Sequence, residues 1–198
     1  MSKVSFKAGN MLYPLPAVMV STADREGSAN IITVAWAGTV CTNPPMVSIS
    51  VRPTRYSHHM IVETREFVIN LTTKELARAA DFCGVKSGRD VDKWKELGLT
   101  RAAAREVSVP CIAESPVNIE CRVERIEQLG SHDMFIARVA AVQVDDAYID
   151  ERGGFHLEQA EPIVYSHGDY FALGSRLGKF GYSVQKRLDG KKKNRYHK

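Results

Sequence analysis

The amino-acid sequence predicts a mainly β protein, built as an antiparallel barrel or sandwich with helices packed on its outside. Strand-like runs rich in Val, Ile and aromatic residues precede and follow one helical stretch at residues 72–98. This order lacks the strand–helix alternation of a parallel sheet and therefore favours antiparallel pairing. With 198 residues, 44% of them hydrophobic, and with neither a repeat nor a Gly/Ser-rich linker, the chain can bury one core. Residues 1–198 are predicted to form a single domain.

The N-terminal part of the chain predicts four strands and a short helix. The run "PAVMVSTADREGSANIITVAWAG" (16–38) is typical of a hairpin, with Gly27 supplying a positive φ angle in its turn. "PPMVSISV" (44–51) alternates between an apolar face and a serine face, as a half-buried strand does. "EFVINL" (66–71) is the fourth strand. A short helix is expected before it, with Ser57 as its N-cap.

The middle and C-terminal parts predict two helices followed by a long strand pair. Thr72 and Glu75 have the spacing of a capping box, and Gly84 is expected to end the first helix. A second short helix is expected to end at Gly98. "VNIECRVERIEQL", "GSHD" and "MFIARVAAVQV" (117–144) then form the clearest antiparallel hairpin of the sequence.

The charge of the chain is concentrated at its C-terminus. The formal net charge of +4 combines +6 on residues 186–198 with −2 on the remainder, so a basic field for nucleic acid is absent. The tail is expected to be a solvated, frayed terminus; a phosphate-binding role is its alternative. No apolar run is long enough to span a bilayer, and two prolines interrupt "MLYPLPAVMV" (11–20), which argues against a signal peptide. The sequence predicts a soluble, cytoplasmic protein without nucleic-acid or membrane partners.

Cysteine and histidine spacing gives no sign of a metal site. The four cysteines are irregularly spaced and lack a C-x-x-C pair, so reduced and mostly buried thiols are expected. Cys41 is expected to be a buried thiol, with a reactive thiol as the alternative. His58 and His59 are neighbours on the predicted helix and would point in different directions, which disfavours joint ligation.

The segment "SISVRPTRYSHHMI" (48–61) carries the strongest functional signal that the residues alone provide. The sequence contains no G-x-G-x-x-G after a strand, no Walker loop, no G-x-S-x-G and no H-E-x-x-H, so a bound cofactor is the expected source of chemistry. A helix N-terminus preceded by Arg52 and Arg55 and containing Ser57 offers amides, a hydroxyl and positive charge to a phosphate. An ordinary capped helix with solvated arginines is the alternative interpretation.

Five segments in this order resemble the flavin reductase-like and flavoredoxin branch of the FMN-binding split-barrel flavoproteins. They are "NIITVAWAG" (30–38), "NPPMVSISVRPTRYSHHMI" (43–61), "FVINL" (67–71), "FCGVKSGRDVDKW" (82–94) and "LGSHDMFIARV" (129–139). The resemblance covers roughly residues 10–185. It implies a six-stranded antiparallel FMN-binding split barrel with peripheral helices, which in this family is usually a homodimer with FMN near the dimer interface.

The resemblance also implies positions for the cofactor-binding residues. Near the flavin ring it places Asn30, Ala35, Trp36, Ala37, Gly38, His132 and Tyr165. Along the ribityl chain it places Ser50, Val51 and Arg52, and at the phosphate it places Arg55, Tyr56, Ser57, Ser87 and Lys93. An amide of the 35–38 segment aimed at the N1–C2=O region would stabilise the negative charge of the reduced ring.

Several of these residues have a plainer alternative. Trp36 could be a core residue, Lys93 could pair with Asp90 along its helix, and His132 could be a simple turn residue.

His167 and Tyr170 could reach the substrate side of the ring.

The resemblance implies an NAD(P)H-dependent flavin or ferric reductase, in which hydride passes to N5 of FMN and electrons leave to free flavin, a ferric chelate or a redox partner protein. The cofactor would carry the chemistry, so no catalytic side chain is assigned. A flavoredoxin-like electron carrier without a productive NAD(P)H site is the alternative. A third possibility is a non-flavin ligand-binding or nucleic-acid-binding barrel that uses the basic tail.

Overall fold

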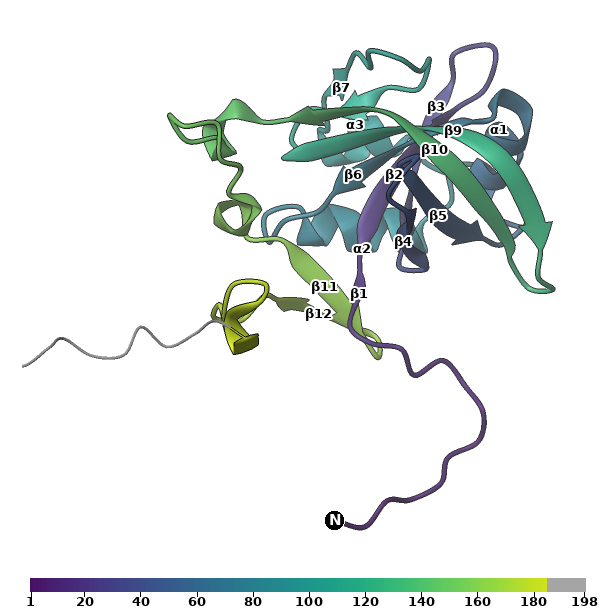
Figure 1. The fold of residues 1–198 in the computed structure, drawn as a ribbon. Helices are drawn as coiled ribbons and strands as arrows, with labels where there is room; N and C mark the ends of the chain where they lie inside the picture. Colours follow the sequence, from purple (N-terminus) through teal and green to yellow (C-terminus); the bar gives the residue numbers. More distant parts are fainter. Residues whose placement is uncertain (185–198) are drawn as a thin grey trace, which may run out of the picture.

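A seven-stranded antiparallel sheet forms the body of the molecule in the computed structural model, which describes residues 1–184 (Figure 1). The basic tail predicted at residues 186–198 lies outside this range. In spatial order the strands are β3 (Ala29–Val34), β2 (Val18–Ala23), β6 (Glu66–Leu71), β9 (Val117–Gln128), β10 (Asp133–Val144), β5 (Met46–Val51) and β4 (Ala37–Cys41). All six pairings are antiparallel, as predicted. The sheet has one strand more than the six expected, and β4, which pairs with β5, is a strand that the sequence pattern did not show separately.

The sheet curls around one apolar core. Alternation along the strands directs one set of side chains inward, which explains why Val47, Ile49 and Val51 of β5 are buried while the two serines between them are half-buried. Strands β2, β3, β6, β9 and β10 and helix α1 (Tyr56–Thr64) contribute the other side chains of this core. The edge strands β3 and β4 are joined through residues 35 and 36. The backbone N–H of Ser50 donates to the carbonyl of Trp36 at 2.8 Å, which ties this corner to β5.

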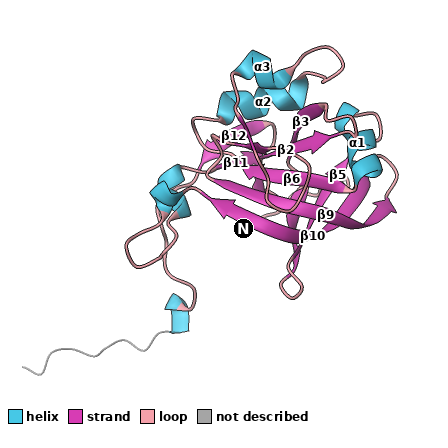
Figure 2. Ribbon diagram, turned by 90° about the horizontal axis from the view of Figure 1, so that it is seen from above, coloured by secondary structure: helices cyan, strands magenta, loops and turns pink. Residues whose placement is uncertain are grey.

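Helices cover the outer face of β2 and β3. Met19 and Ile31 face away from the barrel core and pack against α2 (Ala77–Val85) and α3 (Lys93–Leu97), which lie side by side in Figure 2. Asp92 caps α3 by accepting from the N–H groups of Trp94 and Lys95, and Gly98 ends it in the left-handed conformation, as predicted. None of the helices within residues 1–184 is long and apolar enough to span a bilayer.

A small arm extends from the barrel. It consists of β1 (Leu15–Pro16), β11 (Ile163–Ser166) and β12 (Asp169–Ala172), which form a three-stranded sheet (Figure 1). The 3-10 helices η1 (Asp146–Tyr148) and η2 (Leu157–Ala160) precede this sheet, and η3 (Tyr182–Val184) follows it. A short ribbon of β7 (Arg101–Ala102) and β8 (Cys111–Ile112) lies elsewhere on the barrel.

Three of the expected helix boundaries are wrong. The N-cap of α1 is Arg55, and Ser57 lies one residue inside the helix, fully buried. The capping box at Thr72 does not form, because the Thr72 hydroxyl donates to the carbonyl of Ala17 across the sheet and α2 begins later, at Ala77. Gly84 lies inside the last turn of α2 and packs against Thr33 instead of ending the helix.

All four cysteines carry free thiols. Cys83, Cys111 and Cys121 are buried, as predicted, and burial raises the pKa of Cys83 and of Cys111 to about 11. Cys41 is half-buried, which corrects the expectation of a buried thiol. It ends β4, an edge strand of the sheet, where the barrel core covers only one of its sides.

Candidate functional site

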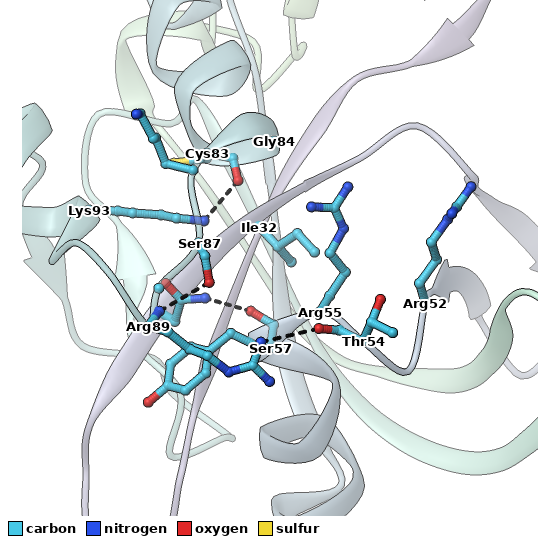
Figure 3. A pocket seen from close by; sticks show the side chains of 14 residues that line it. Ile32, Arg52, Thr54, Arg55, Ser57, Cys83, Gly84, Ser87, Arg89 and Lys93 are labelled. Atoms are coloured by element: carbon cyan, nitrogen blue, oxygen red, sulfur yellow. Dashed lines mark hydrogen bonds between the residues drawn. The ribbon is translucent and has the colours of Figure 1, made fainter.

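Two adjoining cavities open beside the N-terminus of α1 and beside α2. The first, which we term the basic cavity, has a volume of about 350 Å³ and is lined by parts of β3, residues 52–57, α2 and the loop after it (Figure 3). The second, the aromatic cavity, has a volume of about 620 Å³ and extends past β5 and the β9–β10 turn to β11 and β12. The cavities share Ile32, Arg52, Arg55 and Gly84. An elongated ligand with two chemically different ends would therefore fit across both.

The basic cavity is built to hold an anion. Five of its lining residues are cationic and none of them is Asp or Glu; the cations are Arg52, Arg55, Lys86, Arg89 and Lys93. The N-terminus of α1 reaches the same cavity through Tyr56 and Ser57, so the first-turn amides of that nine-residue helix add their partial positive charge. Positive charge and backbone amides together are the donors that a phosphate group requires.

Ser57 connects the cavity to the barrel. Its Oγ accepts from Nδ2 of Asn30 at 2.9 Å and from Oγ1 of Thr22 at 3.1 Å, and all three side chains are buried. These bonds join the first turn of α1 to β2 and β3. Because a hydroxyl oxygen can accept two bonds and still donate its own proton, Ser57 retains a donor for a ligand. It is both a wall of the cavity and a structural junction.

Lys93 approaches the cavity from the outer helices. It is buried, and its Nζ donates to the carbonyl oxygen of Cys83 at 2.8 Å (Figure 3). It also donates to the carbonyl oxygen of Ile31 at 2.6 Å. Burial lowers the pKa of Lys93 to about 8, with nearby Arg55 acting in the same direction and Cys83 opposing it. The alternative pairing with Asp90 is not found among the ion pairs of residues 1–184. Two of the three ammonium protons are engaged, so one remains for an anion.

Gly88 and Arg89 close the basic cavity and were not predicted from the sequence. A Cβ on Gly88 would lie 2.4 Å from Oδ1 of Asn30 and 2.6 Å from the Tyr56 ring, so only glycine fits there. The Arg89 guanidinium lies 5.6 Å from the Tyr56 ring centroid and donates to the carbonyl of Thr54 at 3.3 Å. In the sequence these two residues appear only as the glycine and the arginine of "KSGRD". Their place in the cavity depends on a long-range contact with the start of α1, which no local pattern shows.

The aromatic cavity is lined by flat side chains from three separate segments. The rings of Trp36 and His132 are nearly parallel, with an interplanar angle of 4° and centroids 6.3 Å apart. Burial, together with Arg52 and Arg55, lowers the pKa of His132, which favours its neutral imidazole. Trp36 is 37% exposed and therefore not a core residue. Such walls suit a planar ring system.

Thirteen of the fifteen predicted residues line one or both cavities. Those in the basic cavity are Asn30, Arg52, Arg55, Tyr56, Ser57, Ser87 and Lys93. Those in the aromatic cavity are Ala35, Trp36, Ser50, Val51, Arg52, Arg55, His132 and Tyr165. Ala37 and Gly38 line neither cavity, because they already belong to β4 and pair with Ile49 and Ser48 of β5.

His58, His59 and His167 have separate partners. Nε2 of His58 lies 2.8 Å from Oδ2 of Asp133, and His59 packs edge-on against Tyr56, so the two neighbouring rings point to different places. His167 packs against Tyr13 at 4.2 Å between centroids and does not line the aromatic cavity, whereas Tyr170 does.

Comparisons with known proteins agree with this fold. The family model described as "Flavin reductase like domain" matches residues 10–174. Flavoredoxin of Desulfovibrio vulgaris (Miyazaki F) has a similar structure, with a TM-score of 0.86 and 31% identity, covering 93% of this chain and 100% of that one. Flavoredoxin from Methanosarcina acetivorans gives a TM-score of 0.83 and 25% identity with the same coverage. An uncharacterized protein of Archaeoglobus fulgidus is 31% identical over 139 residues, which are 70% of this chain and 77% of that protein.

Proposed function

This chain belongs to the flavin reductase-like family and is a flavin-associated protein; on that premise we propose that it binds FMN, with the phosphate in the basic cavity and the isoalloxazine ring in the aromatic cavity. The observation that carries the proposal is the pairing of a cavity with five cations and no carboxylate with a cavity walled by flat side chains. The cationic end favours a phosphorylated flavin over riboflavin.

The residues that line the cavities fit this cofactor. Arg52 and Arg55 lie on the wall that both cavities share, where the chain between ring and phosphate would pass. Ser57 and the amides of α1 would hold phosphate oxygens, and Arg89 would cover them. Trp36 and His132 would flank the ring, and the lowered pKa of His132 favours a neutral imidazole beside it.

We propose an NAD(P)H-dependent reductase as the activity. Bound FMN would supply an N5 that accepts hydride and a ring that then releases electrons to free flavin, a ferric chelate or a redox partner protein. The protein would bind and orient the cofactor and shield one side of it, and no side chain is required as an acid or base. The volume of the aromatic cavity, about 620 Å³, supports this proposal, because a nicotinamide ring would need space beside the flavin ring.

An electron carrier without a nicotinamide site is the second candidate. The structural similarity to two flavoredoxins, at 31% and 25% identity, favours it. The two candidates differ in the source of electrons: the reductase takes them from a nicotinamide, and the carrier takes them from another protein.

Two measurements test these proposals. Apoprotein titrated with FMN and with riboflavin should bind FMN at least tenfold more tightly, since the basic cavity contributes charge-assisted bonds only to the phosphate. Equal affinity for the two flavins would contradict the phosphate assignment. Anaerobic stopped-flow mixing of the FMN complex with NADH and NADPH should bleach the flavin band. An unbleached band with both nucleotides would contradict the reductase and favour the carrier.

We further propose that the chain forms a homodimer through its arm. Phe171, Leu173, Leu177 and Phe180 are each at least half exposed and follow one another along residues 171–180. Large apolar side chains grouped in this way are typical of an interface between chains. A cytoplasmic location and the lack of nucleic-acid partners stay predictions from the sequence.

A further inference from the structure

A third cavity adjoins the phosphate end of the proposed site. It has a volume of about 460 Å³ and is lined mainly by the start of β3, by α1 and by residues 88–93. Five residues line both this cavity and the basic cavity: Asn30, Tyr56, Gly88, Arg89 and Lys93. They therefore form the boundary between the two cavities.

Most of this boundary is held by close packing. A Cβ on Gly88 would lie 2.4 Å from Oδ1 of Asn30 and 2.6 Å from the Tyr56 ring, so the backbone of the loop rests directly on both side chains. Asn30 and Lys93 are buried and hydrogen-bonded inside the protein. These four residues are therefore fixed by the fold.

Arg89 is the exposed member of the boundary. Its side chain reaches from the loop after α2 to Thr54, where the guanidinium donates to the carbonyl oxygen at 3.3 Å (Figure 3). The same guanidinium lies 5.6 Å from the centroid of the Tyr56 ring, a distance at which a cation and an aromatic ring attract each other. The side chain thus joins the loop to the start of α1, and we term it the Arg89 strap.

The strap bears on how far a phosphate-linked ligand can extend. FMN ends at a phosphate monoester and so would end inside the basic cavity. In FAD that phosphate continues into a second phosphate and an adenosine, and the third cavity is the adjoining space that could receive them. Both flavins carry about two negative charges at pH 7, since the second pKa of a phosphate monoester is about 6. Charge therefore hardly separates the two ligands, whereas length does.

We propose that the Arg89 strap makes the site select a flavin with a single phosphate over a flavin dinucleotide, by closing the way from the basic cavity into the third cavity. This inference rests on the proposed FMN site and adds a specificity-determining residue to it. Two roles of Arg89 can be told apart by removing its side chain. Loss of a cation alone would weaken the binding of both flavins, whereas loss of the strap would strengthen FAD binding, because it opens the way for the adenosine end.

The test titrates FMN and FAD into the flavin-free protein at pH 7 and measures both affinities by calorimetry. Wild-type protein should bind FMN at least about tenfold more tightly than FAD. Arg89→Ala should bind FAD about three- to tenfold more tightly than wild type does, and FMN more weakly. Lys86→Ala is the matched control. Lys86 is an exposed cation that lines the basic cavity but not the third cavity, so its loss should weaken the binding of both flavins.

Each result of these titrations supports or overturns the strap. Equal affinity of wild type for FMN and FAD would overturn it, and so would an unchanged or lower FAD affinity in Arg89→Ala. A gain in FAD affinity that is as large in Lys86→Ala would overturn it too, because Lys86 does not border the third cavity. In each of these cases FMN binding by wild type would leave the proposed function standing. Failure of wild type to bind FMN would instead overturn the proposed function itself.

Discussion

At the scale of single residues, Ser57 and Arg55 have different tasks although they are two positions apart. Ser57 is fully buried and accepts bonds from Asn30 and Thr22, whereas Arg55 is exposed at the mouth of both cavities. The sequence alone predicted that both contribute to a phosphate site at the N-terminus of a helix. The structure separates them, because Ser57 supports the fold as well as lining the basic cavity, whereas Arg55 only faces the cavities.

The two single substitutions should differ in their effect on the free energy of unfolding. Ser57→Ala should lower the free energy of unfolding by about 1–3 kcal/mol, because two buried donors lose their acceptor. Arg55→Ala should leave the free energy of unfolding within about 0.5 kcal/mol of wild type and weaken FMN binding about tenfold. Urea unfolding of the apoprotein and FMN titration measure the two effects. Tight FMN binding by Arg55→Ala would contradict the assignment of the basic cavity to the phosphate.

Lys93 should make FMN binding depend on pH. Its pKa of about 8 lies below the ordinary value of 10.5, so the ammonium is present below pH 8 and is lost as the pH rises through that value. FMN affinity should therefore fall between pH 7 and pH 9, by about tenfold if the remaining proton meets the phosphate. Riboflavin titrated over the same range is the control and should show no such fall.

The lowered pKa of Lys93 should affect the stability of the apoprotein in the opposite direction: stability should rise with pH where FMN affinity falls. Between pH 8 and pH 10.5 the unfolded chain binds more protons at Lys93 than the folded chain, so this group makes the fold more stable as the pH rises. In Lys93→Met both effects should disappear. Its melting temperature is needed as a control, because two carbonyl groups lose their donor. A pH-dependent FMN affinity that survives in a folded Lys93→Met would show that another group is responsible.

At the scale of elements, a buried carboxylate fixes the 103–108 loop to the barrel. Glu120 of β9 accepts from the backbone N–H groups of Arg105, Glu106 and Val107 and from the side chain of Gln143 on β10. Burial acts to raise the pKa of Glu120, but the hydrogen bonds together outweigh it and the pKa is lowered. Its stabilising contribution is therefore present above the unfolded pKa and is lost as the pH falls through the folded pKa.

Glu120→Gln should lower the free energy of unfolding at pH 7 by about 2 kcal/mol, since an amide offers one acceptor oxygen where the carboxylate offers two. The difference between variant and wild type should shrink in acid, because the unfolded wild-type chain takes up a proton at Glu120 at a higher pH than the folded chain does. Urea unfolding of variant and wild type at pH 7 and pH 3 measures the loss of stability and its dependence on pH. Glu124→Gln, at an exposed residue of the same strand that pairs with Arg138, is the matched control. A loss of stability that is equal at both pH values would contradict the role of the charge.

The long strands were predictable and most of the helix ends were not, for a physical reason. Alternation along residues 117–144 is a local property that survives in any context, and β9 and β10 appear where it predicts them. Caps instead depend on competition between partners. The Thr72 hydroxyl donates to the carbonyl of Ala17, between β1 and β2, and so does not cap the helix, while Gly84 fits against Thr33 at a helix–sheet contact.

At the scale of the whole molecule, the candidate site could be predicted only in part. Residues on strands and at the N-terminus of α1 were found because their segments match a family pattern. Gly88, Arg89 and Asp81 were not predicted; they come from a loop and a helix, and Asp81 meets Tyr170 of the arm because α2 and the arm fold back over β3. No local spacing contains that information, since the partners are up to 89 residues apart.

The assembly proposed through the arm is open to a direct measurement. Wild-type protein should sediment with twice the mass of one chain, and Phe171→Asp combined with Leu173→Asp should sediment with the mass of one chain, because two buried charges would oppose an apolar interface. Val62→Asp, an exposed apolar residue on α1, is the control and should remain dimeric. A monomeric wild type at micromolar concentration would contradict the dimer.

The two tryptophans of the chain lie in different surroundings, and this gives the protein a built-in optical reporter. Trp36 forms a wall of the aromatic cavity, whereas Trp94 is buried between α3 and the outer face of the sheet. Indole emission overlaps flavin absorption, so FMN entering the cavity should quench Trp36 most strongly. Trp36→Phe should therefore remove most of the quenching seen on titration with FMN, and Trp94→Phe should preserve it. With Trp94 as the only emitter, the fluorescence would follow unfolding, so the two variants would let ligand entry and loss of structure be timed separately in one cuvette.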